Sequence, residues 1–266
     1  MSLVMFRQAI VDLRRTVLWY AIGTAAYAAM ILSIFPTLRG NSRQMQDYLD
    51  SMPDALIKAF GIADITTLPG FLGAEYLNLV WPIIAAVFAI LAGSAVVARE
   101  IDQGTVELWL SVPESRARLL WAKLGAVALG IIAIVIATIV TIVLGATLID
   151  ETVSASAIIA TTGVLAAFTL AIGGYAAFFS SWMSERGKAA GLAAGLTLVF
   201  YALWIVASLS NTLHSLRYVS IFSLYDPQTA LATGDIPWAK IAVLLVIGVV
   251  GAVAAVKIFQ RRDAIA

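Results

Sequence analysis

The sequence predicts an all-α integral membrane protein whose single domain crosses the bilayer six times. Of its 266 residues, 61% are hydrophobic and only 12% are charged, and the mean hydropathy is +0.95. Soluble domains carry about 25% charged residues, so this composition lies far outside their range. A spanning helix needs about 20 apolar residues. Uncharged runs predict spans near 17–37, 76–97, 123–148, 155–180, 189–209 and 238–257. The run at 241–256 is short, and it reaches spanning length only with Trp238 and the apolar stems of Lys240 and Lys257.

The first sixteen residues predict an amphipathic helix at the membrane surface. Apolar residues recur there every third or fourth position, at Leu3, Phe6, Ile10, Leu13 and Val17. Arg7, Arg14 and Arg15 fall off that stripe, which is typical of an interfacial helix. A cleaved signal peptide is the alternative, because small residues follow at 27–29. A signal's charged region is usually shorter, which favours the surface helix.

The distribution of Lys and Arg predicts which side each loop occupies. Of the 17 basic residues, twelve fall before the first span, in 98–123, in 181–188 and after the last span. The longer opposite loops hold the other five. Cytoplasmic loops carry the excess of Lys and Arg. We therefore expect a multi-pass protein of the plasma or inner membrane, with both termini and residues 98–122 in the cytoplasm.

Two segments are expected on the external side. Residues 38–75 contain a helical pattern, in which Pro53 and Asp54 open a turn and Gly61 closes it, so amphipathic helices on the outer leaflet are predicted there. Residues 210–237 carry Tyr218, Phe222 and Tyr225 at helical spacing, which predicts a short helix dipping into the outer interface. An interfacial aromatic belt is the alternative explanation of that stripe.

Two local signals shape the predicted spans. Trp81-Pro82 predicts a kink in the second span, because Pro removes a backbone donor and its ring clashes with the preceding turn. Asp150-Glu151 is the only charged pair between two long apolar runs. A tight external turn at this pair would join the third and fourth spans as a hairpin.

Residues 99–123, which we call the charged segment, hold eight charges between two uncharged runs and must lie in water. Gly104 can end a helix in the left-handed conformation, and Thr105 can cap a following turn that contains Glu107. Ser111 to Glu114 form a capping box, which predicts a helix running from Ser111 through Lys123. The charged segment is therefore expected to contain two short helices rather than an irregular linker.

Leu108, Trp109 and Leu110 are apolar residues in this water-facing segment. One explanation is that they pack against the ends of the chain's own spans. The other is that a short helix carrying them docks in a groove of a soluble partner.

Three glycines at four-residue spacing, Gly187, Gly191 and Gly195, give the fifth span a flat face. Such a face lets another helix approach closely. The first span offers small residues at the same interval, Ala21, Ala25 and Ala29. Contact within one chain and a seam between two copies are both consistent with this pattern.

The residues needed for catalysis or for cofactor and metal binding are missing. The chain has no Cys, which excludes disulfides and thiol catalysis, and a lone His214 excludes His-based metal clusters. No phosphate-binding Gly-x-x-x-x-Gly-Lys loop occurs, and no ionisable residue lies within a span core, as coupled carriers generally require. Tyr225-Asp226 and Gly234-Asp235 resemble aspartyl protease fragments, but both fall in one outer loop. The net charge of +1 carries no information about nucleic acid, but no basic cluster interleaved with aromatic residues occurs, so no nucleic-acid partner is expected.

The charged segment resembles a known signature. Glu100 to Arg116, followed by Lys123, is similar to the acidic-Gly-Thr, Leu-Ser-x-Pro, Ser-Arg, Lys pattern of the ABC-2 type permease family, the membrane subunits of ABC exporters. The carboxyl end, Phe259 to Asp263, resembles the usual finish of that family. The six-span layout extends the resemblance over the whole chain.

The resemblance implies a two-fold permease dimer in which each copy binds a cytoplasmic ATP-binding cassette ATPase. That partner, and not this chain, would bind ATP and Mg²⁺. The amino-terminal helix would be the connecting helix, and residues 98–122 would hold the coupling helix. Spans one and five would flank the dimer seam. The implied coupling residues are Glu100, Gly104, Thr105, Val106, Glu107, Leu108, Trp109, Leu110, Pro113 and Arg116.

The expected function is therefore ATP-driven export. The expected seam carries uncharged aromatic side chains, at Tyr20, Tyr27, Phe200, Tyr201 and Trp204. An aromatic lining favours an amphipathic drug, antibiotic or lipid as cargo, although the same residues are also suited to packing within the bundle. The rival interpretation is a membrane scaffold or passive channel that recruits a cytoplasmic partner other than an ATPase.

Overall fold

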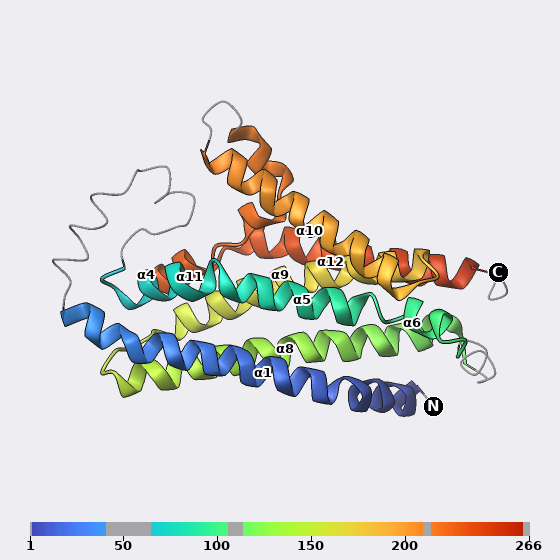
Figure 1. Cartoon of the computed structure of the whole chain (residues 1–266), viewed down its shortest axis with the longest axis horizontal. Helices are drawn as coiled ribbons and strands as arrows, with labels where there is room; N and C mark the ends of the chain where they lie inside the picture. The colour runs from blue at the N-terminus through green and yellow to red at the C-terminus, as the bar shows by residue number, and fades with distance from the viewer. Residues whose placement is uncertain (1, 41–64, 106–113, 210–213, 263–266) are drawn as a thin grey trace.

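Helices make up the core of the structure, a computed structural model that describes residues 2–40, 65–105, 114–209 and 214–262 (Figure 1). No strand occurs among these residues. The elements are α1 (Ser2–Gly40), α4 (Leu68–Leu72), the π-helix η1 (Gly73–Leu77), α5 (Val80–Gly93), α6 (Ala98–Asp102), α8 (Arg116–Leu148), α9 (Ala155–Trp182), α10 (Arg186–Leu209), the 3₁₀ helices η2 (His214–Val219) and η3 (Ile221–Leu224), α11 (Pro227–Thr233) and α12 (Trp238–Arg261).

Five of these helices are long and apolar enough to cross a membrane: α1, α8, α9, α10 and α12. A sixth span results if α4 and η1 are counted together with α5, because this pair passes the same test but is bent by 43°. The start of α1, the end of α12 and the short helix α6 all lie at one end of the bundle (Figure 1). An even number of crossings would place them there.

The amino-terminal segment is not a separate surface helix. The structure has one α-helix from Ser2 to Gly40, with no break between the expected surface helix and the expected first span. The sequence supplies no Gly or Pro before Gly23 to interrupt it, and Pro36 falls in its last turns. Because a helix continues until a breaker or cap stops it, the basic stretch extends the spanning helix.

The break in the second span lies one turn earlier than predicted. The helix is interrupted at Asn78 and Leu79, between η1 and α5, and not at Trp81-Pro82. Pro82 lacks the N–H that would bond to the carbonyl of Asn78, so it fits the first turn of a new helix but not the interior of an old one. Tyr225 donates to the Leu77 carbonyl at 2.6 Å, which satisfies a backbone acceptor exposed by the break.

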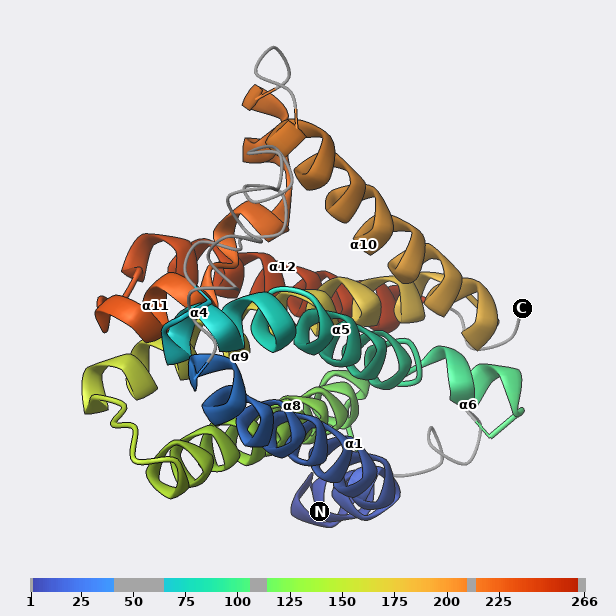
Figure 2. The ribbon, with the colours of Figure 1, turned by 60° about the vertical axis from the view of Figure 1, so that its left-hand side comes forward.

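Two helix pairs dominate the packing: α1 lies along α8, and α12 lies along α9 (Figure 1, Figure 2). Glycines allow the second pair its close approach. A Cβ at Gly174 of α9 would collide with the Gly248 backbone of α12, lying 2.6 Å from its Cα. A Cβ at Gly251 would lie 2.5 Å from the Gly174 carbonyl carbon. The two backbones are therefore in direct contact.

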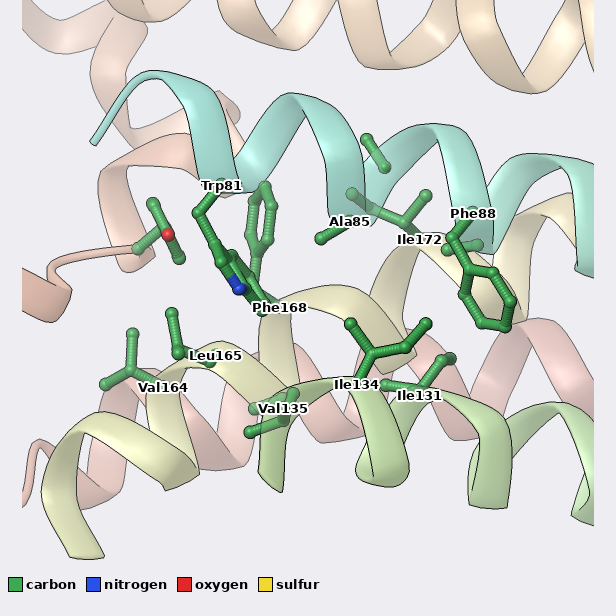
Figure 3. Packing of buried hydrophobic residues seen from close by; sticks show 14 of the residues in the cluster. Trp81, Ala85, Phe88, Ile131, Ile134, Val135, Val164, Leu165, Phe168 and Ile172 are labelled. Carbon is green, nitrogen blue, oxygen red and sulfur yellow. The ribbon is translucent and has the colours of Figure 1, made fainter. Parts of the chain in front are cut away.

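The buried core joins α5, α8 and α9. Figure 3 shows Trp81 and Phe88 of α5 facing Ile131 and Ile134 of α8, with Phe168 of α9 between these helices. The Trp81 Nε1–H donates to Thr138 Oγ1 at 3.0 Å, so the indole is satisfied within the core. Helix α9 has the largest buried share of the five unbroken candidate spans and contacts both neighbours.

The segment before α12 does not form the predicted aromatic helix. It consists of η2, η3 and α11, and the three aromatic residues of the expected stripe do not share a face: Phe222 and Tyr225 are buried, whereas Tyr218 is 78% exposed. Ser220 caps the start of the 3₁₀ helix η3, and Asp226 caps the start of the α-helix α11, so the segment is divided into short pieces. Tyr225 and Phe222 instead pack against Phe168.

The turn between α8 and α9 contains Asp150 in the left-handed conformation, with φ 57°. Ser154 then caps α9 by accepting a hydrogen bond from the Ala157 N–H at 3.2 Å. The expected amphipathic helices of residues 41–64 fall outside the described residues.

Candidate functional site

The first helix of the charged segment, α6, ends at Asp102, and Gly104 two residues later is the left-handed residue that stops it, as predicted. Gly104 is left-handed, with φ 67°. The Thr105 N–H bonds to the Glu100 carbonyl at 2.9 Å and the Gly104 N–H bonds to the Ile101 carbonyl at 3.1 Å. These two bonds form a Schellman cap, which satisfies carbonyls that the helix leaves open. The chain therefore leaves α6 in a defined direction.

Glu100 joins the two parts of the charged segment that lie on either side of residues 106–113. We call α6 with Gly104 and Thr105 the entering flank, and Ser115 with the start of α8 the returning flank. The Glu100 carboxylate accepts a hydrogen bond from the Lys123 ammonium at 2.7 Å, and the two side chains are 18% and 17% exposed. The Thr105 hydroxyl donates to its other oxygen at 2.5 Å. A small cavity of about 60 Å³ beside this pair is also lined by Asp12 of α1 and by Arg99. The site thus connects α6, α8 and α1.

Electrostatics keep Glu100 ionised. Partial burial raises its pKa, but hydrogen bonds from Lys123 and Thr105 and the positive charges of Lys123 and Arg99 outweigh it, and the net pKa is lowered from the ordinary 4.5. A carboxylate with a lowered pKa contributes stability above its unfolded pKa and loses it as pH falls through its folded pKa. The connection between the flanks is consequently intact at neutral pH.

Glu100→Gln should lower the free energy of unfolding by about 2 kcal/mol at pH 7, because the mostly buried Lys123 loses the carboxylate that lies 2.7 Å from its ammonium. The measurement is thermal unfolding in detergent, followed by Trp fluorescence from pH 7 down to pH 4. The stability advantage of the wild-type over the variant should shrink as pH falls below the ordinary 4.5 and through the lowered pKa of Glu100. Asp12→Asn is the control, because it removes a carboxylate beside the ion pair but leaves the pair itself. This variant should keep most of the stability difference between wild-type and Glu100→Gln at pH 7. Equal stability of wild-type and Glu100→Gln at pH 7 would disprove the role given to the ion pair.

The returning flank differs from the prediction. The capping box predicts one helix from Ser111 through Lys123, but α8 begins at Arg116. Ser115 is extended, with ψ 140°, and its hydroxyl accepts a hydrogen bond from the Arg118 N–H. Glu114 and Ser115 are not helical, so no single helix runs unbroken from Ser111 to Lys123, and Ser115 caps α8 directly before the long apolar stretch. Ser111 itself lies outside the described residues.

The structure describes only part of the predicted coupling set. Glu100, Gly104, Thr105 and Arg116 flank residues 106–113 on both sides. Arg116 points toward the other end of the chain, where its Nη1 donates to the Arg262 carbonyl at 2.5 Å. Outside the described residues lie Val106, Glu107, Leu108, Trp109, Leu110 and Pro113.

Two residues that sequence reasoning missed secure this end of the bundle. Ser180 of α9 accepts hydrogen bonds from the N–H groups of Val97 and Ala98, both at 3.0 Å, and donates to the Ser94 carbonyl at 2.7 Å. One buried hydroxyl therefore satisfies the backbone break between α5 and α6. The signal was the Ser180-Ser181 pair ending an apolar helix, although Ser is common enough in spans to hide it.

Arg262 is the second of these residues. Its Nη1 donates to the carbonyls of Ser181 at 3.0 Å and Met183 at 2.9 Å, and its Nη2 donates to Ser184 Oγ at 2.6 Å. The guanidinium thus fastens the end of α12 to the loop between α9 and α10. The Arg-Arg pair at the carboxyl end carried the signal, but spacing does not tell which Arg turns inward.

The predicted seam residues are accessible in the single chain. Gly187, Gly191 and Gly195 are exposed, and a Cβ at any of them would meet nothing within 4 Å. On α1, Ala21 and Ala25 are half-buried and Ala29 is exposed. Helices α1 and α10 both border α5, and α10 diverges from the bundle towards Leu209 (Figure 2). The glycine face therefore remains open to a neighbour in the membrane.

The predicted path residues fall into two separate groups. Tyr20 packs edge-on against Phe88, and Tyr27 packs against Tyr76. Tyr201 and Trp204 stack on each other and both contact Phe222. Phe200, the remaining member, is half-buried and its carbonyl accepts a hydrogen bond from Ser220. A single chain does not assemble these aromatics into one lining.

Hollows lie beside the second group. Tyr201 lines an apolar groove of about 310 Å³ between α5 and α10. Trp204 lines a cavity of about 610 Å³ with Asn78, Gln228 and Lys240, at the opposite end of the bundle from the charged segment. Among the described residues, no group of three or more His, Cys, Asp or Glu side chains could hold a metal ion.

Comparison with known proteins gives one family match. A protein-family model described as "ABC-2 family transporter protein" matches residues 6–264, nearly the whole chain. No curated protein matches the sequence.

Proposed function

The chain belongs to the ABC-2 transporter family, and from that membership we propose that it is the permease subunit of an ATP-driven exporter. The single observation that carries the proposal is the family match over residues 6–264. Permeases of this family typically work with an ATPase subunit. This chain lacks a phosphate-binding loop of its own, so the energy would come from such a partner.

The charged segment is the proposed docking site for the ATPase, on the cytoplasmic side. Its two flanks are held in fixed positions by the Schellman cap at Gly104, the Glu100–Lys123 pair and the Ser115 cap. A fixed frame on both sides supports a docking role for residues 106–113, because pre-organisation lowers the cost of binding. Leu108, Trp109 and Leu110 would supply the buried anchor of the interface, and Glu107 its polar rim.

The second proposed partner is another permease copy. The open glycine face of α10 supports a seam there, since small residues let helices approach closely in a bilayer. Ala21, Ala25 and Ala29 of α1 would complete it.

Aromatic grooves near Tyr201 and Trp204 support an amphipathic cargo such as a drug, antibiotic or lipid. Membrane lipid would surround the bundle of this multi-pass inner-membrane protein.

Purification from the native host tests the proposal. The expected result is that a protein with ATPase activity co-purifies with the wild-type chain. Leu108→Asp combined with Trp109→Ala should weaken ATPase binding about 1,000-fold, because two anchor residues worth about 2 kcal/mol each total about 4 kcal/mol and every 1.4 kcal/mol is about tenfold. The matched control is Arg118→Ala, an exposed residue on the flank that pairs locally with Glu114. A non-ATPase protein bound at this segment would instead favour the scaffold or channel interpretation.

A further inference from the structure

Both flanks of the charged segment are attached to the same short stretch of chain. On the entering flank, the Ser180 hydroxyl accepts hydrogen bonds from the first backbone N–H groups of α6, at Val97 and Ala98. Ser180 belongs to the last turn of α9. A movement of α6 therefore acts directly on the end of α9.

The returning flank reaches that place through the carboxyl end of the chain. Arg116, the first residue of α8, donates to the carbonyl of Arg262. The Arg262 side chain donates in turn to Ser181, Met183 and Ser184, the residues that follow Ser180. Residues 180–184, which we call the α9 terminus, are thus the point where the two flanks meet.

Helix α9 connects this terminus with the far end of the bundle. It has the largest buried share of the five unbroken candidate spans, and its Gly174 lies directly against the backbone of α12. Near its first turn it contacts α11, where Gly234 approaches the side chain of Ser156. Packed interiors transmit displacement instead of absorbing it, because they have few voids and low compressibility. A displacement applied at the α9 terminus would therefore reach α11.

We propose that the α9 terminus is where displacement of the charged segment enters the membrane bundle, and that Arg262 is the positioning residue that ties the returning flank to it. The inference rests on the proposed function, in which an ATPase moves the charged segment. It also gives a role to Arg262, which lies within the carboxyl-terminal motif. Arginine suits this position because its planar guanidinium donates hydrogen bonds to several acceptors in fixed directions, which a lysine ammonium does not.

The test uses the permease purified with its co-purifying ATPase in lipid nanodiscs. The variants are Arg262→Gln, Arg262→Lys and the matched control Arg261→Gln, which changes the exposed neighbour. Because the chain has no Cys, Ala232→Cys in α11 can carry a single bimane label. The readouts are the amount of ATPase retained, the rate of ATP hydrolysis and the change in bimane fluorescence when ATP is added.

For Arg262→Gln we expect unchanged ATPase retention and a fluorescence response reduced about fivefold or more, the size of a typical coupling between sites. Arg262→Lys should recover part of the response, and Arg261→Gln should match the wild-type. If Arg262→Gln fails to fold, Ser184→Ala removes one acceptor from an exposed position and should reduce the response in the same direction.

The outcomes separate the two claims. If no ATPase accompanies the wild-type chain, the proposed function fails. The proposed transmission through Arg262 and the α9 terminus, which we call the relay, fails with it. If the ATPase binds and Arg262→Gln responds to ATP as the wild-type does, the relay alone is wrong. Loss of ATPase retention in Arg262→Gln would also overturn the relay, because Arg262 would then act on docking and not on transmission.

Discussion

Replacing Gly174 by Val should leave almost no folded protein. A Cβ at this position would overlap the backbone of Gly248 in α12, and Gly251 packs against Gly174 from the same helix. Backbone atoms cannot rotate away as a flexible side chain can, so α9 and α12 would have to separate along their main contact. We expect a loss of about 4 kcal/mol or more, which is the range reserved for severe core defects. Size-exclusion chromatography in detergent should show aggregate instead of a monodisperse peak.

Gly23→Val is the matched control for this substitution. Gly23 lies within α1, and a Cβ there would meet nothing within 4 Å. Both changes put the same β-branched residue into a helix, so the intrinsic helix cost cancels in the comparison. Gly174→Ala should give an intermediate defect. A Gly174→Val protein as monodisperse and as thermally stable as Gly23→Val would show that the two backbones are not in contact.

The sequence was sufficient for the class of fold, because long uncharged runs are compatible with few structures other than membrane helices. Helix ends were harder to predict. The merging of the amino-terminal stretch with the first span follows from the lack of a breaker, whereas amphipathic periodicity suggested a boundary. The break before α5 is stabilised by Tyr225, which is 148 residues away from Leu77 in the chain. No local pattern carries that information.

Some features of the candidate site could likewise be predicted from the sequence, and others could not. Gly104 was predictable because its left-handed conformation is a local property of a helix end. The Glu100–Lys123 pair was not, since it depends on how α6 and α8 lie across residues 106–113. The roles of Ser180 and Arg262 require the α9 terminus, α6 and α12 to meet in space. Each of these residues is ordinary in its own stretch of sequence and acquires its role only from tertiary contacts.

The second large effect is expected for Ser180→Ala. The wild-type hydroxyl satisfies three backbone groups at once: the N–H groups of Val97 and Ala98 and the carbonyl of Ser94. All of these residues are buried, so water cannot replace the hydroxyl. A buried polar group left without a partner costs about 1 to 3 kcal/mol, so three such groups give a total loss of at least about 3 kcal/mol. The unfolding midpoint followed by Trp fluorescence should fall by about 10 °C.

Ser181→Ala isolates the cause of that loss. Ser181 is the adjacent residue and is equally buried, but its Oγ finds no hydrogen-bond partner among the described atoms. Removing this hydroxyl should therefore be neutral or slightly stabilising, while its backbone carbonyl continues to accept from Arg262. The same atom is deleted from neighbouring buried residues in both variants, so loss of side-chain volume cannot explain a difference between them. Equal midpoints for the two variants would mean that the backbone break between α5 and α6 does not depend on Ser180, and the entering flank of the charged segment would then lose its attachment to α9.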